Sequence, residues 1–148
     1  MSSKTHPELD AFEEKFRTRE LLVREFEHWL WSVRPIQATL GAGVLSLKRY
    51  AKKFSDLSER ETGELARVVT VIEKTLSEAF HYDKINYLML MMVDPHVHFH
   101  VIPRYASARR FAGREWQDPG WPALPQLAGE PSDAETLRAV VEKLKSAQ

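Results

Sequence analysis

The chain has 148 residues, of which 43% are apolar and 28% are charged, and this composition is typical of one soluble globular domain. Its 21 basic and 21 acidic side chains cancel, which leaves no whole-molecule field for binding a nucleic acid polymer or an anionic membrane. The chain contains no cysteine, so disulfides, thiolate catalysis and thiolate metal sites are excluded.

The sequence shows no recognisable targeting or membrane segment. Residues 1–14 are polar and lack the apolar stretch of a secretory signal. The longest nearly uncharged apolar run, residues 87–93, is too short to span a bilayer. We therefore expect a cytoplasmic protein with no membrane partner.

The N-terminal third combines a helical pattern with two strand patterns. Apolar residues spaced mostly three, four or six apart over 7–26 predict one helix or two short helices. Residues 29–33 (WLWSV) are mostly aromatic or β-branched and end just before a proline, which predicts a strand. A second short strand is predicted over 44–47, after Gly41 and Gly43.

The middle of the chain contains the clearest helix. Ser58 and Glu61 have the spacing of a capping box, and an apolar stripe at helical spacing follows, so we predict a helix over 58–80. Residues 85–93 (INYLMLMMV) are apolar on both faces and predict a central, doubly covered strand. Residues 97–102 alternate and predict another strand, ended by a proline.

The C-terminal third begins as a loop and ends as a helix. Residues 113–131 are rich in glycine and proline and predict an ordered surface loop, and Ser132 with Glu135 forms a second capping box that opens a final helix. The resulting order is helix, two strands, helix, two strands, helix. This order favours an α+β fold, in which helices pack on an antiparallel sheet.

Three of the six histidines lie within five residues, as His96, His98 and His100. Residues two apart in a strand share a face, so the three imidazoles are expected to project to one side, about 7 Å apart. One neutral imidazole can attack phosphorus and form a covalent phospho-histidine intermediate. The other two can donate hydrogen bonds to phosphate oxygens, where negative charge develops.

Two other interpretations of the three histidines remain open. They can be polar strand residues without a function, although three unused imidazoles on one face are costly to bury. They can also be metal ligands, and Asp94 lies close by in the sequence. Against the metal site, no second cluster of His, Asp and Glu stands out, and adjacent residues of one strand chelate a single ion poorly.

Residues 96–105 (HVHFHVIPRY) resemble the signature of the histidine triad (HIT) family, in which three histidines alternate with apolar residues. The tail Pro103-Arg104-Tyr105 is similar to that of members that hydrolyse dinucleoside polyphosphates. The resemblance covers residues 29–105. It implies a single HIT-like domain over 1–148, flanked by an N-terminal helical segment (7–27) and a C-terminal loop and helix (106–148).

The resemblance also implies a chemistry. His98, the middle histidine, would attack the α-phosphate and become nucleotidylated, while His96 and His100 would orient it and contact phosphate oxygens. Substrates would be dinucleoside polyphosphates or related nucleotides, no cofactor would be needed, and the protein would be a homodimer with its sheets joined across the two-fold axis. The alternative is a module that binds nucleotides without turning them over.

Two features of the family pattern are missing from this sequence. Many members have a histidine after a glycine in the strand before the helix, whereas this chain reads Gly-Ala-Gly-Val at 41–44. Many also carry a Gly-rich phosphate-binding loop just before the triad, whereas here Asp94 and Pro95 lead directly into His96. Part of the phosphate-binding site must therefore be replaced by other groups.

Three other polar residues are candidates for substrate binding, and each has a plainer interpretation. Arg104 can contact phosphate or be a solvated cation at a strand end, and the same applies to Lys48. Asn86 can contact ribose or phosphate or be an ordinary polar strand residue.

The four tryptophans form two pairs. Trp29 and Trp31 share one strand face and predict core or dimer packing. Trp116 and Trp121 lie in the predicted loop, where they can stack on a base or form a small separate cluster.

Overall fold

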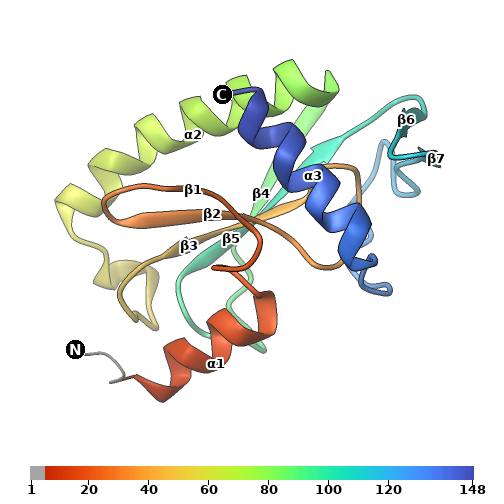
Figure 1. Ribbon diagram of the computed structural model, residues 1–148. Helices are drawn as coiled ribbons and strands as arrows, with labels where there is room; N and C mark the ends of the chain where they lie inside the picture. The colour runs from red at the N-terminus through yellow and green to blue at the C-terminus, as the bar shows by residue number, and fades with distance from the viewer. Residues whose placement is uncertain (1–5) are drawn as a thin grey trace.

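The protein is described from a computed structural model that defines residues 6–148, and the start of the polar segment predicted over 1–14 lies outside them. A five-stranded sheet forms the centre of the molecule, with helices on both faces (Figure 1). The elements in chain order are α1 (Pro7–Phe16), β1 (Leu22–Glu25), β2 (Trp29–Val33), β3 (Gly43–Leu47), the 3-10 helix η1 (Phe54–Asp56), α2 (Glu59–Phe80), β4 (Lys84–Leu88), β5 (His98–Arg104), β6 (Arg109–Phe111), β7 (Arg114–Trp116) and α3 (Ala134–Ser146).

The large sheet has the strand order β1-β2-β3-β5-β4, and every neighbouring pair is antiparallel. The strands β6 and β7 form a separate two-stranded hairpin. This arrangement confirms the predicted α+β class with an antiparallel sheet. The predicted strands over 29–33 and 44–47 are also confirmed, as β2 and β3.

The two faces of the sheet are covered by different helices. The helices α2 and α3 lie on one face, whereas α1 crosses the opposite face (Figure 1). The main core belongs to the α2 and α3 face and includes Trp29 and Trp31, which are fully buried. A smaller cluster of Phe12, Phe16 and Val44 lies under α1.

The helix α2 begins as the capping box predicts. The Ser58 hydroxyl accepts from the backbone N–H of Glu61, and the Glu61 carboxylate accepts from the backbone N–H of Ser58. Arg49 donates two hydrogen bonds to the same carboxylate, which lowers the pKa of Glu61 to about 2. The long loop after β3 is thereby joined to the start of α2. No helix within residues 6–148 is long and apolar enough to cross a membrane.

The helical prediction over 7–26 is correct only for its first half. The helix α1 ends where Arg17 adopts a left-handed conformation with φ of 53°, and residues 22–25 form strand β1 instead. The burial of the side chains alternates along this segment: Leu21 and Val23 are buried, Leu22 is half-buried and Arg24 is exposed. That alternation has the period of a strand.

The predicted strand over 85–93 is present only for residues 85–88, and its predicted central, doubly covered position is wrong. The strand β4 ends at Leu88 and lies at the edge of the sheet, where β5 is its one neighbour among residues 6–148. Its continuation forms a loop in which Met91 has φ of 51° and Met92 and Val93 are 83% and 84% exposed. The apolar run over 85–93 suggested a strand covered on both faces. The chain instead forms an edge strand followed by an exposed loop.

Two predicted boundaries also shift. The strand β5 continues through Pro103 to Arg104, because pairing with β3 already ends at Val101 and β3 requires no N–H from the proline. The cap of α3 is Asp133 rather than Ser132, since the Asp133 carboxylate accepts from the backbone N–H of Thr136. The predicted loop over 113–131 is otherwise present, although its first residues belong to strand β7.

Candidate active site

The three histidines lie at the start of β5, on the sheet face that α1 covers. His96 precedes the strand, and His98 and His100 lie in it, paired with Ser46 and Val44 of β3. The rings of His98 and His100 are 5.0 Å apart between centroids. All three side chains are nearly inaccessible, with exposed fractions of 1%, 2% and 7% in chain order. The structure therefore brings the predicted row of imidazoles together, but under a cover of protein.

His96 has both ring nitrogens engaged with the backbone. Its Nε2 donates to the Leu47 carbonyl at 2.8 Å, and its Nδ1 accepts from the Ala51 N–H at 3.3 Å. These two contacts require the neutral ring, and burial lowers the pKa of His96. His96 is thus held between β3 and the following loop and has no ring nitrogen left for a ligand.

Among the described residues, one ring nitrogen of His98 forms a hydrogen bond and the other forms none. Its Nδ1 lies 2.6 Å from the His96 carbonyl, which can only accept, so Nδ1 carries the proton. In the neutral ring the lone pair is then on Nε2. Burial lowers the pKa of His98, so the neutral ring predominates near pH 7. This tautomer presents a nucleophilic nitrogen.

His100 lies beside His98 and is the most strongly perturbed of the three histidines. Burial, followed by the positive charge of Arg34, lowers its pKa to about 4. Its Nδ1 is buried and has no hydrogen-bond partner within residues 6–148. A proton is better placed on the other nitrogen, Nε2, because a buried N–H without an acceptor is costly. His100 is therefore a neutral ring whose Nε2–H is available to a ligand.

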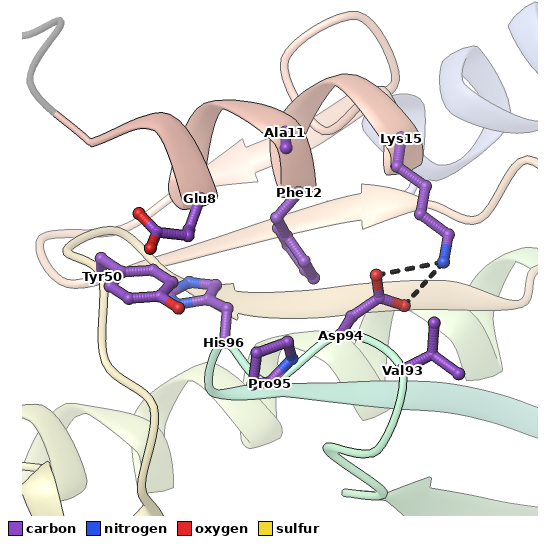
Figure 2. A pocket seen from close by; sticks show the side chains of 9 residues that line it. All are labelled: Glu8, Ala11, Phe12, Lys15, Tyr50, Val93, Asp94, Pro95 and His96. Atoms are coloured by element: carbon purple, nitrogen blue, oxygen red, sulfur yellow. Dashed lines mark hydrogen bonds and ion pairs between the residues drawn. The ribbon is translucent and has the colours of Figure 1, made fainter.

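The helix α1 lies directly over these rings. The Phe12 ring centroid is 5.0 Å from that of His96 and 4.9 Å from that of His98, and Phe16 lies 5.8 Å from His98. Figure 2 shows Phe12 pointing from the helix toward the sheet. The Lys15 ammonium contacts both carboxylate oxygens of Asp94, at 2.8 and 3.0 Å, and so connects the helix to the loop before the triad.

Two cavities flank that ion pair, because Lys15 and Asp94 line both. One, of about 260 Å³, lies over His96, where the Tyr50 ring stacks at 5.4 Å from the imidazole (Figure 2). The other, of about 380 Å³, is lined by both His98 and His100. The second cavity is large enough for part of a nucleotide and contains the histidine with the free Nε2.

Arg34 also lines the cavity beside His98 and His100, and the sequence analysis missed it. It follows β2 directly, and only 8% of its surface is exposed. Its local sequence, Val33-Arg34-Pro35, contains no signal that separates it from any other arginine at a strand end. Only the fold shows that this cation reaches the triad.

The three substrate-binding residues predicted from the sequence line neither cavity. Arg104 donates to Asp118 at 2.6 Å and to the side-chain oxygen of Asn86 at 2.7 Å, so these three residues form one partly buried network. Lys48 pairs with Glu25 at 2.7 Å. In this structure Arg104, Asn86 and Lys48 are engaged by neighbouring residues of the chain.

The tryptophans divide between the core and the C-terminal region. Trp29 and Trp31 are in the core, as one of the two sequence interpretations predicts. Trp116 is buried in its hairpin and donates to the Phe111 carbonyl at 2.9 Å. Trp121 borders a different hollow, beside Tyr105 and Asp118. Neither loop tryptophan lines the cavities at the triad.

A metal site requires several ligands that converge on one point. Over the part of the chain that the structure describes, no group of three or more His, Cys, Asp or Glu side chains is arranged to hold a metal ion. The three triad rings instead differ in their hydrogen bonding, with His96 held by the backbone and His98 oriented by a carbonyl.

Comparison with known proteins supports the resemblance seen in the sequence. Residues 43–107 match the family model of the HIT domain. The comparison with curated proteins found no match.

Among solved structures, a histidine triad (HIT) protein from Sinorhizobium meliloti superposes with a TM-score of 0.71 at 19% identity, covering 89% of this chain and 93% of that one. A hypothetical histidine triad nucleotide-binding protein from Sulfolobus tokodaii gives 0.68 at 18% identity, with coverages of 90% and 88%. A Hit-like protein involved in cell-cycle regulation from Bartonella henselae also gives 0.68 at 18% identity, with coverages of 93% and 95%. At these identities the likeness establishes a shared fold.

Proposed function

We propose that this chain, which contains a HIT domain over residues 43–107, is a nucleotide hydrolase or transferase. It would cleave at the α-phosphate of a dinucleoside polyphosphate or related nucleotide, through a covalent nucleotidyl-His98 intermediate. It would act in the cytoplasm and, in line with the family resemblance, as a homodimer without a cofactor.

The observation that carries this proposal is the orientation of His98. Its Nδ1–H is bound to the His96 carbonyl at 2.6 Å, so the lone pair lies on Nε2, and the ring lines the 380 Å³ cavity. A nucleophilic imidazole must be neutral and held in the right tautomer. Burial lowers the pKa of His98 and so favours the neutral ring, and the backbone hydrogen bond fixes the tautomer. His96 serves as a positioning residue in this scheme, because its ring is held by the backbone and its carbonyl orients His98.

The chemistry proceeds in two displacements at the same phosphorus. Nε2 of His98 attacks the α-phosphorus, a P–N bond forms, and the P–O bond to the leaving polyphosphate breaks with its electron pair on the departing oxygen. Water then attacks the phosphorus, the P–N bond breaks with its pair returning to Nε2, and the water proton passes to solvent. The Nε2–H of His100 would donate to a phosphate oxygen during both steps.

The test is intact-protein mass spectrometry after brief, acid-free quenching with diadenosine polyphosphate. Three proteins are compared: wild type, His98→Ala and His28→Ala, whose histidine lies outside the triad. We expect an adenylyl mass on wild type and on His28→Ala, and none on His98→Ala. Wild-type turnover by a correctly folded His98→Ala variant would contradict the assignment of the nucleophile. If product forms without an adduct on wild type, single-turnover rates decide whether the intermediate is too short-lived to trap.

One observation favours a second candidate, a module that binds nucleotides without turning them over. Phe12 and Phe16 cover the triad so closely that His98 is only 2% exposed. Tight binding of the nucleotide with neither adduct nor product would support this second function.

A further inference from the structure

Within residues 6–148, Arg34 is a buried cation without a counter-ion. Both of its hydrogen bonds come from one nitrogen, Nη1, which donates to the carbonyls of Ile36 at 3.0 Å and Leu127 at 2.9 Å. Its Nε is buried and has no partner among the described residues. Over the same residues, Arg34 forms no ion pair with a carboxylate. A charge taken out of water is costly unless an opposite charge compensates it.

Arg104 provides a contrast within the same molecule. It is as deeply buried as Arg34, with 4% exposed, but the Asp118 carboxylate binds it through Nε and Nη2 at 2.6 and 3.2 Å. Among the described residues, one buried arginine is therefore neutralised by a carboxylate and the other is not. The difference is that Arg34 borders a cavity, where an anionic ligand can supply the missing charge.

The other titratable side chains at this cavity are less suited than Arg34 to bind an anion. Lys15 already contacts both oxygens of Asp94. The side chains of His98 and His100 are uncharged near pH 7, since burial lowers the pKa of both. Arg34 is the cation of the cavity lining that lacks a carboxylate partner within residues 6–148.

We propose that Arg34 is the phosphate-binding residue of the cavity beside His98 and His100, and that its guanidinium replaces the Gly-rich loop missing before the triad. The inference rests on the proposed function, because it names the group that holds the phosphate of that nucleotide. Guanidinium presents its donors in a planar fork that matches phosphate oxygens, and Nη1 is held rigidly by two carbonyls. The donors left for a ligand are Nη2, which makes no hydrogen bond to the described residues, and the buried Nε.

The experiment is calorimetric titration of AMP and of adenosine into wild type, Arg34→Met, Arg34→Lys and Arg138→Met. Arg138 is an exposed arginine of α3, on the opposite face of the sheet, and serves as the matched control. We expect Arg34→Met to weaken AMP binding roughly 10- to 100-fold, as for a lost hydrogen bond to a charged group, and to leave adenosine binding within about twofold. Arg34→Lys should fall between, because it keeps the charge and loses the fork. Arg138→Met should match wild type.

Each other result has a definite meaning. If wild type binds AMP and both Arg34 variants bind it equally well, this inference fails while the proposed function stands. If Arg34→Met weakens AMP and adenosine alike, Arg34 only holds the loop at Leu127, and the inference fails as well. If wild type does not bind AMP or diadenosine polyphosphate, the proposed function and the inference fall together. Thermal unfolding of each variant shows whether it is folded. If Arg34→Met is unfolded, the comparison of Arg34→Lys with wild type tests the inference by itself.

Discussion

His100 should make the protein sensitive to acid, and the size of the effect follows from its pKa. The folded-state pKa is about 4, against the ordinary histidine value of 6.5, so the unfolded chain takes up a proton first as the pH falls. The stability contributed by the neutral ring is therefore present above pH 6.5 and is lost progressively as the pH falls toward 4. A difference of about 2.5 pKa units corresponds to about 3 kcal/mol in the free energy of unfolding once the whole pH range between the two pKa values is crossed. About 2 kcal/mol of this is lost between pH 7 and pH 4.5.

The assay is urea unfolding of wild type and His100→Gln at these two pH values. Wild type should lose about 2 kcal/mol more than the variant on acidification, because glutamine does not titrate. His96 and His98 also have lowered pKa values, so the variant should still lose some stability. Val68→Ala is the control, since it removes apolar contacts from the main core and should lower stability equally at both pH values. Equal acid losses in wild type and His100→Gln would refute the reasoning.

Three further predictions concern parts of the structure around the site. Ser58→Ala should cost about 1 kcal/mol in urea unfolding, because it removes the cap of α2, and unchanged stability would contradict that role. Arg104→Met should cost about 3 kcal/mol by leaving the Asp118 carboxylate buried without its partner, and calorimetry should show AMP affinity within about twofold of wild type. Phe12→Ala should raise the rate of triad carbethoxylation by diethylpyrocarbonate several-fold, and an unchanged rate would mean that α1 does not limit access to His98.

The parts of the fold that local pattern determines were predictable from the sequence. The capping box at Ser58 and the aromatic strand over 29–33 depend on neighbouring residues alone, and both are confirmed. The errors occur where tertiary position decides. The run over 85–93 is apolar enough for a central strand, yet no further strand pairs beyond β4 within residues 6–148, and the end of the run turns outward. Apolar composition cannot distinguish a covered strand from an edge strand with an exposed loop.

The site shows the same division. The alternation of three histidines predicted their common face, because that depends only on the strand period. Their separate roles were not predictable, since His96 is engaged by Leu47 and Ala51, which lie more than forty residues earlier in the chain. Arg34 was missed for the same reason. Its importance comes from meeting β5 and the loop at Leu127 in space.

These placements change how the missing loop should be understood. A Gly-rich loop binds phosphate through backbone N–H groups. Before this triad stands Pro95, which has no N–H, and Asp94, whose carboxylate pairs with Lys15. Pro95 therefore offers no amide donor directly before the triad. Two side chains at the cavity can supply donors in place of that amide, Arg34 after β2 and His100 on β5. An anion bound there would be held by a guanidinium and a neutral imidazole, so its affinity should depend on the charge of Arg34 and fall with rising salt.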